Sequence, residues 1–264
     1  MLYWDGLGGC GLHANELGPL FADRHGLRVV APDPPGHGAS PALPPEAFRP
    51  SALAELAAAL LDELGLDWTV FVGFSWGARV GCSFAASFPE RTAALVLVDG
   101  GYLSPGDLGA DLEADLATCV AEARQEVEED SFETWEEYFA FQRESLGRWS
   151  AALEEAHRAM MREADGRVVP ILGPESLGAI KHGGRLEPVT ETYPEIASAG
   201  IPVLLLTARD PDVPEIAQRG VMRFREALPD ARVEAMAGAH DLVSDDPARV
   251  EDLVGVFVAA QPPP

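Results

Sequence analysis

The feature that most constrains the fold of this chain is a serine between two glycines, where an apolar strand meets a helix. The run Val70-Phe-Val-Gly73 is as uniformly apolar as a buried strand, and it continues through Phe-Ser75-Trp-Gly77 into a helical pattern. A serine at such a sharp turn points its hydroxyl outward, while flanking glycines tolerate the strained backbone and close packing. The helix N-terminus behind it favours developing negative charge. The segment therefore predicts a nucleophile, Ser75; the alternative is a tight turn with a buried capping serine.

Short apolar runs alternate with helical segments on both sides of this motif. The predicted strands cover residues 27–31, 68–72, 94–98, 201–206 and 231–236. Unbroken apolar strands that alternate with helices are typical of a parallel sheet covered on both faces. The sequence thus predicts an α/β fold whose core comprises residues 1–101 and 196–264.

Residues 102–195 interrupt this alternation. Their apolar side chains recur at helical spacing, and no segment among them has the pattern of a buried strand. We therefore expect a helical insert in a single α/β domain, with the segment Lys181-His-Gly-Gly-Arg185 forming one of its loops. The insert is strongly acidic, which is typical of a solvated surface; the alternative is that it discourages anionic substrates.

A nucleophilic serine needs a base and an acid that orients the base. Asp210 follows the predicted strand 201–206, and His240 lies in a loop after the strand 231–236. In an open parallel sheet these strand ends share one carboxyl edge, where such folds bind ligands. The order of the three residues therefore predicts a triad of Ser75, His240 and Asp210. Taken singly, Asp210 is also typical of a helix cap, and His240 of a surface residue.

With these residues in place, the chain resembles the α/β-hydrolase superfamily over nearly its whole length. The matching stretches cover residues 30–40, 73–77, 202–214 and 238–247. The resemblance implies an α/β-hydrolase fold, a mostly parallel sheet with helices on both faces, and a cap, or lid, formed by residues 102–195. It also favours Asp210 over Asp212 as the acid and gives His37 a structural role.

The resemblance implies hydrolysis through an acyl-enzyme. Ser75 attacks an acyl carbonyl after passing its proton to His240, and the backbone N–H groups of Leu7 (alternatively Gly8) and Trp76 form the oxyanion hole. We expect a carboxylesterase, lactonase or thioesterase for a small acyl substrate, with aminopeptidase, carbon–carbon hydrolase and perhydrolase chemistry left open. A serine here, in place of an aspartate, disfavours the dehalogenase and epoxide-hydrolase branches. No metal or organic cofactor is implied.

Substrate choice is expected to reside in the cap. Trp4, Trp135 and Phe139 are predicted to line an apolar substrate pocket. The alternative is that the aromatic residues of the cap form its own small core.

The chain departs from the family pattern in two ways. The family's usual first two strands are missing ahead of the loop that begins at Asp5, so we expect either that the sheet lacks these strands or that the chain starts late relative to the natural protein. The family's usual His-Gly is Asp5-Gly6 here, and an unpaired carboxylate near the oxyanion would oppose catalysis by repulsion. The alternative is that the Asp5 carboxylate is turned away from the oxyanion or is paired with an arginine. A catalytically inactive small-molecule binding protein of the same fold is therefore an alternative.

A second glycine pattern points to a different function. Gly6-Leu-Gly8-Gly-Cys-Gly11 satisfies G-x-G-x-x-G, and Asp33 follows about 20 residues later. On a dinucleotide-binding fold the glycines admit a pyrophosphate, and the aspartate holds the ribose hydroxyls. A dinucleotide-dependent oxidoreductase is thus a further alternative, although the strand before this loop is very short.

Composition limits the partners of the chain. Its 43 acids and 19 bases give a net charge of −24, which would repel a nucleic-acid backbone. No apolar run approaches the length of about 20 residues that spans a bilayer, so we expect no membrane association. Three widely spaced cysteines and a start unlike a secretory signal favour the cytoplasm. Formation of a homo-oligomer stays open.

Overall fold

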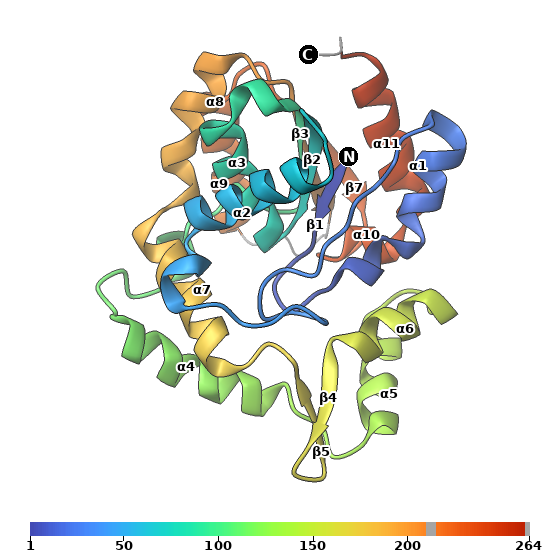
Figure 1. The fold of residues 1–264 in the computed structure, drawn as a ribbon, viewed down its shortest axis with the longest axis vertical. Helices are drawn as coiled ribbons and strands as arrows, with labels where there is room; N and C mark the ends of the chain where they lie inside the picture. The colour runs from blue at the N-terminus through green and yellow to red at the C-terminus, as the bar shows by residue number, and fades with distance from the viewer. Residues whose placement is uncertain (210–214, 262–264) are drawn as a thin grey trace.

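A central parallel sheet organises the computed structural model, which describes residues 1–209 and 215–261 (Figure 1). Its strand order is β1-β2-β3-β6-β7, and every neighbouring pair is parallel. The strands are β1 (Leu2–Trp4), β2 (Thr69–Phe74), β3 (Thr92–Val98), β6 (Val203–Arg209) and β7 (Arg232–Ala237). The predicted α/β fold is confirmed.

Helices cover both faces of this sheet (Figure 1). One face carries α1 (Leu17–His25), α10 (Leu242–Asp245) and α11 (Pro247–Ala259), and the other carries α2 (Pro50–Glu63), α3 (Trp76–Ser87), α8 (Tyr193–Ala199) and α9 (Glu215–Ala227). Short 3₁₀ helices lie between them: η1 (Gly11–Asn15), η2 (Pro45–Phe48) and η3 (Pro89–Arg91).

The two faces of the sheet bury alternate residues of each strand. In β2, Phe71 packs toward α2 and α3, whereas Val70 and Val72 pack toward α1 and α11. In β6, Leu205 faces the first group and Leu204 the second. Because successive strand side chains point to opposite faces, an unbroken apolar run is what a sheet buried on both sides requires.

The predicted strand 27–31 is reduced to a single bridge. Val30 pairs with Leu2, its N–H donating to Met1 O at 2.9 Å and its carbonyl accepting from Tyr3 N at 2.8 Å. Among the described residues, no strand pairs with its outer side, and Pro32, two residues further on, has no N–H to donate to β1. The ladder therefore ends after one residue.

Most of the insert lies at one end of the molecule (Figure 1), whereas its last 3₁₀ helix packs against α3 of the core. The insert comprises η4 (Pro105–Leu108), α4 (Leu116–Glu129), α5 (Trp135–Ser145), α6 (Ala151–Ala159), β4 (Met161–Ala164), β5 (Arg167–Pro170), α7 (Pro174–Leu186) and η5 (Val189–Thr192). The antiparallel hairpin β4–β5 corrects the wholly helical prediction. Its turn, Asp165-Gly166, has φ of 51° and 77°, as expected of a two-residue Asp-Gly hairpin turn.

The predicted loop at residues 181–185 is wrong, because this segment belongs to α7. The division of the chain into core and cap stays a prediction, and its boundary at residue 195 falls inside α8. None of the helices that the structure describes combines the length and the apolar character needed to cross a membrane.

Candidate active site

Ser75 occupies the turn between β2 and α3. Its φ of 51° and ψ of −113° lie in a region that side-chain-bearing residues rarely adopt. A Cβ at Gly73 would lie 2.4 Å from Gly77 O, and one at Gly77 would lie 2.2 Å from Trp4 O. Both glycines are therefore required for the strand and the helix to approach each other, and the serine is held in a strained, outward-facing position.

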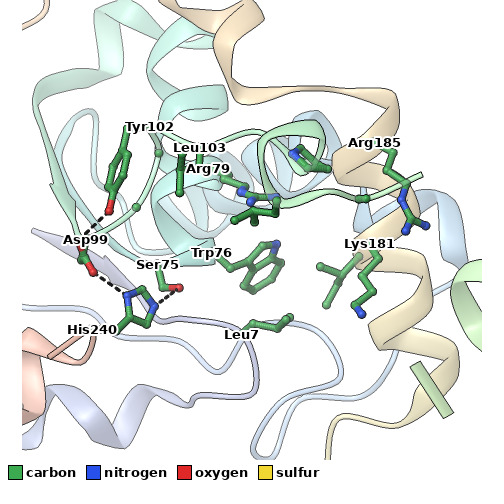
Figure 2. Close-up of a pocket in the computed structure, with 16 residues that line it drawn as sticks. Leu7, Ser75, Trp76, Arg79, Asp99, Tyr102, Leu103, Lys181, Arg185 and His240 are labelled. Carbon is green, nitrogen blue, oxygen red and sulfur yellow. Dashed lines mark hydrogen bonds and ion pairs between the residues drawn. The ribbon is translucent and has the colours of Figure 1, made fainter. Parts of the chain in front are cut away.

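His240, in the loop between β7 and α10, lies between a hydroxyl and a carboxylate. Its Nε2 is 2.8 Å from Ser75 Oγ, and its Nδ1 is 2.7 Å from Asp99 Oδ2 (Figure 2). The ring also packs against Phe74 at a centroid distance of 5.2 Å. The structure thus brings two predicted residues, Ser75 and His240, into hydrogen-bonding contact.

Asp99 is a site residue that the sequence analysis missed. It directly follows β3, has a φ of 42°, and is only 8% exposed. Its Oδ1 accepts hydrogen bonds from Tyr102 Oη at 3.0 Å and from Ala208 N at 3.1 Å. The sequence feature that could have identified Asp99 is an aspartate at the carboxyl end of the buried strand β3, which pairs with β2, the strand that precedes Ser75. The predicted acid Asp210 lies outside the described residues, as does Asp212.

The carboxylate changes the titration of the histidine. The hydrogen bond to Asp99 raises the pKa of His240 above its ordinary 6.5, against the lowering effect of burial, and the negative charges of Asp99 and Asp241 act in the same direction. An imidazolium at this position is therefore stabilised by its surroundings.

The two predicted oxyanion residues, Leu7 and Trp76, line the same cavity as Ser75 and His240 (Figure 2). Trp76 is the first residue of α3, so its N–H has no intrahelical acceptor. The loop that carries Leu7 lies against Ser75, since a Cβ at Gly6 would be 3.3 Å from Ser75 Cβ. The alternative donor, Gly8, follows with a φ of 80°.

Asp5 lies beside this loop, is fully buried, and is paired. Its Oδ2 lies 2.7 Å from His13 Nδ1, while its Oδ1 accepts from Tyr3 Oη at 2.9 Å and from Gly6 N at 2.8 Å. A Cβ at Gly9 would lie 2.3 Å from Asp5 Oδ2. The partner is a histidine, not the arginine considered from the sequence, and the carboxylate is held within the loop.

Burial alone would lower the pKa of His13, but the charge and hydrogen bond of Asp5 outweigh it and raise that pKa to about 9. The ring stands edge-on to that of His157, 5.5 Å away. Burial and the nearby His13 lower the pKa of His157 to about 4. Asp5 is thus neutralised by an imidazolium, and the second histidine stays uncharged.

The predicted aromatic pocket residues lie elsewhere. Trp4 is 1% exposed and stacks on Phe71 in the core. Trp135 and Phe139 stack on each other at 5.6 Å, and the Arg158 guanidinium lies over both rings. None of the three predicted residues lines the cavity at Ser75; Trp135 and Phe139 pack in the insert's own small cluster.

The cavity at Ser75 has a volume of about 490 Å³, within the range of small-molecule sites. Much of its wall is apolar, with Leu7, Trp76, Leu103 and Ile180 among its residues. Three cationic side chains, Arg79, Lys181 and Arg185, also line it (Figure 2). Arg79 was not among the residues predicted from the sequence.

The glycines that suggested a dinucleotide site have other roles. Asp33 accepts from Gly11 N and Ala39 N, both at 2.8 Å. A Cβ at Gly11 would lie 2.2 Å from Ala31 O. The aspartate therefore organises its own loops, and Gly11 permits a close backbone approach.

His37, in the same region, is buried and stacks on Trp76 at 5.3 Å, with Nδ1 2.9 Å from Pro35 O. Burial lowers its pKa. A neutral ring held in this way fits the structural role expected from the sequence.

Comparison with known proteins places this geometry in a family. The family model described as "alpha/beta hydrolase fold" matches residues 1–247. Among curated proteins, the chain is similar to a 2-hydroxy-6-oxo-6-phenylhexa-2,4-dienoate hydrolase of Burkholderia cepacia, at 36% identity over 107 residues, which are 40% of this chain and 35% of that protein. It is also similar to epoxide hydrolase 2 of Siraitia grosvenorii, at 37% identity over 32% of this chain and 27% of that protein. The match thus spans about a third of the length of these relatives.

Solved structures agree on the fold. The chain superposes on E-2-(acetamidomethylene)succinate hydrolase with a TM-score of 0.76 at 20% identity, covering 98% of this chain and 91% of that one. It superposes on the thioesterase domain from the curacin biosynthetic pathway with a TM-score of 0.65 at 20% identity, covering 97% and 90%. With a family model matched over most of its length and the sheet and helices in the corresponding order, the chain belongs to the α/β-hydrolase fold family.

Proposed function

We propose that the protein is a serine hydrolase that cleaves an ester-like or other acyl bond of a small molecule. Ser75 is the nucleophile, His240 the general base, and Asp99 the acid that orients the imidazole. The observation that carries this proposal is the continuous line of contacts from Ser75 Oγ through His240 to Asp99, at 2.8 and 2.7 Å.

In the proposed reaction, Ser75 Oγ attacks the acyl carbonyl while its proton passes to His240 Nε2. Asp99 accepts a hydrogen bond from Nδ1, fixes the tautomer, and stabilises the imidazolium. The backbone N–H groups of Leu7 and Trp76 receive the oxyanion. His240 then protonates the leaving group, and a water that it activates hydrolyses the acyl-enzyme.

The pairing of Asp5 supports an active enzyme over an inactive binding protein. An unpaired carboxylate beside the oxyanion would raise the barrier by repulsion, but the ion pair with His13 removes that objection. The dinucleotide alternative loses its support, because Asp33 is occupied by Gly11 and Ala39.

The relatives support hydrolysis and leave the substrate open. Their names include hydrolases of a dienoate and of a succinate derivative, an epoxide hydrolase and a thioesterase. Among these chemistries, a serine nucleophile favours acyl transfer over epoxide opening, for which the family uses an aspartate. A carboxylesterase, lactonase or thioesterase without metal or organic cofactor, acting in the cytoplasm, is the function we propose.

The test compares wild type with Ser75→Ala on 4-nitrophenyl butyrate, together with labelling by a fluorophosphonate probe. We expect both turnover and labelling to vanish in Ser75→Ala, with at least about a 10⁴-fold loss of kcat. Ser87→Ala is the matched control, since Ser87 is an exposed serine at the end of the same helix, α3. Wild-type protein that folds but neither labels nor turns over would refute the proposal.

A further inference from the structure

The cavity at Ser75 is cationic in a strongly acidic protein. Arg79, Lys181 and Arg185 line it, whereas the one carboxylate among its described lining residues is Asp99, which already bonds to His240 and Tyr102. The chain as a whole carries a net charge of −24. Three of its 19 lysines and arginines thus line this cavity, so its wall carries more basic than acidic side chains.

Two of these cations are paired with carboxylates of the insert. Lys181 forms an ion pair with Glu126, and Arg185 forms one with Glu122 at 2.9 Å. All four residues belong to α7 and α4, which pack against each other. These pairs therefore join two helices of the insert while they line the cavity.

Arg79 differs from both. Within residues 1–209 and 215–261, its guanidinium makes no ion pair or hydrogen bond. Burial lowers the pKa of Arg79, and the two groups that act on this pKa in the opposite direction, Tyr193 and Cys82, are uncharged at neutral pH. An arginine stays protonated under such conditions, so a desolvated positive charge faces the cavity without a counterion.

The fold holds Arg79 at a fixed position relative to the nucleophile. It lies in the first turn of α3, three residues after Trp76, and it lines the same cavity as Ser75. From the other side, α7 approaches with a glycine, and a Cβ at Gly184 would lie 3.4 Å from Arg79 Nη1. The absence of a side chain there leaves room for the guanidinium.

We propose that Arg79 binds a carboxylate of the substrate, so that the preferred substrates are acyl compounds with a second, anionic end, such as half esters of dicarboxylic acids. This inference rests on the proposed function and names its substrate class. The carboxylate accepts hydrogen bonds from the Arg79 guanidinium, which is suited to bidentate recognition of a carboxylate. The acyl carbonyl meets Ser75, and the apolar wall, including Leu7 and Trp76, covers the carbon chain between the two ends.

A matched pair of esters tests the charge alone. 4-Nitrophenyl hydrogen adipate and 4-nitrophenyl hexanoate have six-carbon acyl chains and differ by a terminal carboxylate. We expect Arg79→Gln to lower kcat/KM for the adipate half ester by about 10–100-fold, the range of a hydrogen bond to a charged group, and to change that for the hexanoate less than about threefold. Arg79→Lys is expected to retain part of the preference.

The control for net charge is Arg249→Gln, because Arg249 is an exposed residue of α11 that pairs with Asp252 away from the cavity. It should leave the ratio of the two esters unchanged. If Arg79 had only a structural role, Arg79→Gln would lower kcat/KM equally for both esters and would reduce the melting temperature. That result would overturn the proposal. We expect the melting temperature of Arg79→Gln to be unchanged or higher, since a desolvated unpaired charge is removed.

Failure of the proposed function gives a separate result. If wild type hydrolyses neither ester and is not labelled by fluorophosphonate, the serine-hydrolase proposal fails, and calorimetry with adipate then tests the anion site alone. Adipate binding that is lost in Arg79→Gln and kept in Arg249→Gln supports the site. Equal binding by wild type and Arg79→Gln, or no binding by wild type, overturns it.

Discussion

Among the described residues, two aspartate–histidine pairs have the same N–O distance, and they differ in what surrounds them. In both Asp99–His240 and Asp5–His13, the carboxylate Oδ2 lies 2.7 Å from the imidazole Nδ1. The His240 side chain is 60% exposed and its Nε2 meets a serine hydroxyl. The His13 ring is buried, and its Nε2 has no hydrogen-bond partner among the described residues.

The difference shows that the pair alone does not make a catalytic site. The carboxylate raises the pKa of the histidine in both pairs, but only His240 has a proton donor on its second nitrogen and access to a cavity. Asp5–His13 instead anchors the loop of Gly6 and Leu7 next to Ser75. In the proposed mechanism, Asp99–His240 moves a proton, whereas Asp5–His13 holds a backbone.

Replacing each histidine by glutamine should separate these roles most strongly. We expect His240→Gln to lower kcat by about 10⁴-fold or more with an unchanged melting temperature, because the side chain is largely exposed. His13→Gln leaves the Asp5 carboxylate without a counter-charge and should cost about 3–5 kcal/mol of unfolding free energy. At temperatures where it is folded, His13→Gln should retain turnover within about tenfold. Ester kinetics and urea unfolding of both variants give the comparison, and equal activity losses would contradict it.

Replacing the two candidate acids distinguishes Asp99 from Asp210. Asp99→Asn keeps the size of the side chain but removes the charge that raises the pKa of His240. We expect kcat to fall by about 10³–10⁴-fold and the remaining activity to extend to lower pH. The sign follows because His240 must be neutral to accept a proton, so a lower pKa moves the acid limb of kcat/KM below that of wild type.

Asp210→Asn is the matched variant for this experiment. We expect it to retain wild-type activity within about tenfold and to leave the acid limb in place. The reverse result, with Asp210→Asn inactive and Asp99→Asn active, would show that the acid predicted from the sequence acts in the enzyme. pH profiles of kcat/KM for both variants decide the question.

What the sequence predicted correctly depends on local pattern. The place of Ser75 at a strand–helix turn was predictable because that turn is encoded by adjacent residues, and the alternation of apolar strands with helices is a property of short windows; the role of Ser75 as nucleophile stays a prediction. The pairing of Asp99 with His240 joins residues 141 positions apart, and several aspartates follow strands in this chain. Sequence reasoning could identify the carboxyl edge of the sheet, but packing decides which carboxylate meets the imidazole.

The segment at residues 181–185 was wrongly predicted for a related reason. Adjacent Gly183 and Gly184 weaken a helix in isolation, so a loop was expected. In the structure, Gly183 approaches Phe48 O, where a Cβ would lie 2.9 Å away, and Gly184 approaches Arg79. These glycines are needed for contacts between segments that are distant in the sequence. The local sequence around Arg79 therefore could not predict that its guanidinium lies at this cavity without an acidic partner.

The smallest expected effect is a pH dependence of stability that belongs to the Asp5–His13 pair. The pKa of His13 is about 9 when folded and 6.5 in its ordinary state. Between these values the folded chain therefore holds a proton that the unfolded chain has lost. Stability from this pair is fully present below pH 6.5 and falls as the pH rises toward about 9, by up to about 3 kcal/mol. Urea unfolding at pH 6.5 and 9 measures this loss in wild type. In His13→Gln, the loss of unfolding free energy between pH 6.5 and 9 should be smaller than in wild type by that amount. An equal loss in both proteins would show that His13 is not the imidazolium that neutralises Asp5.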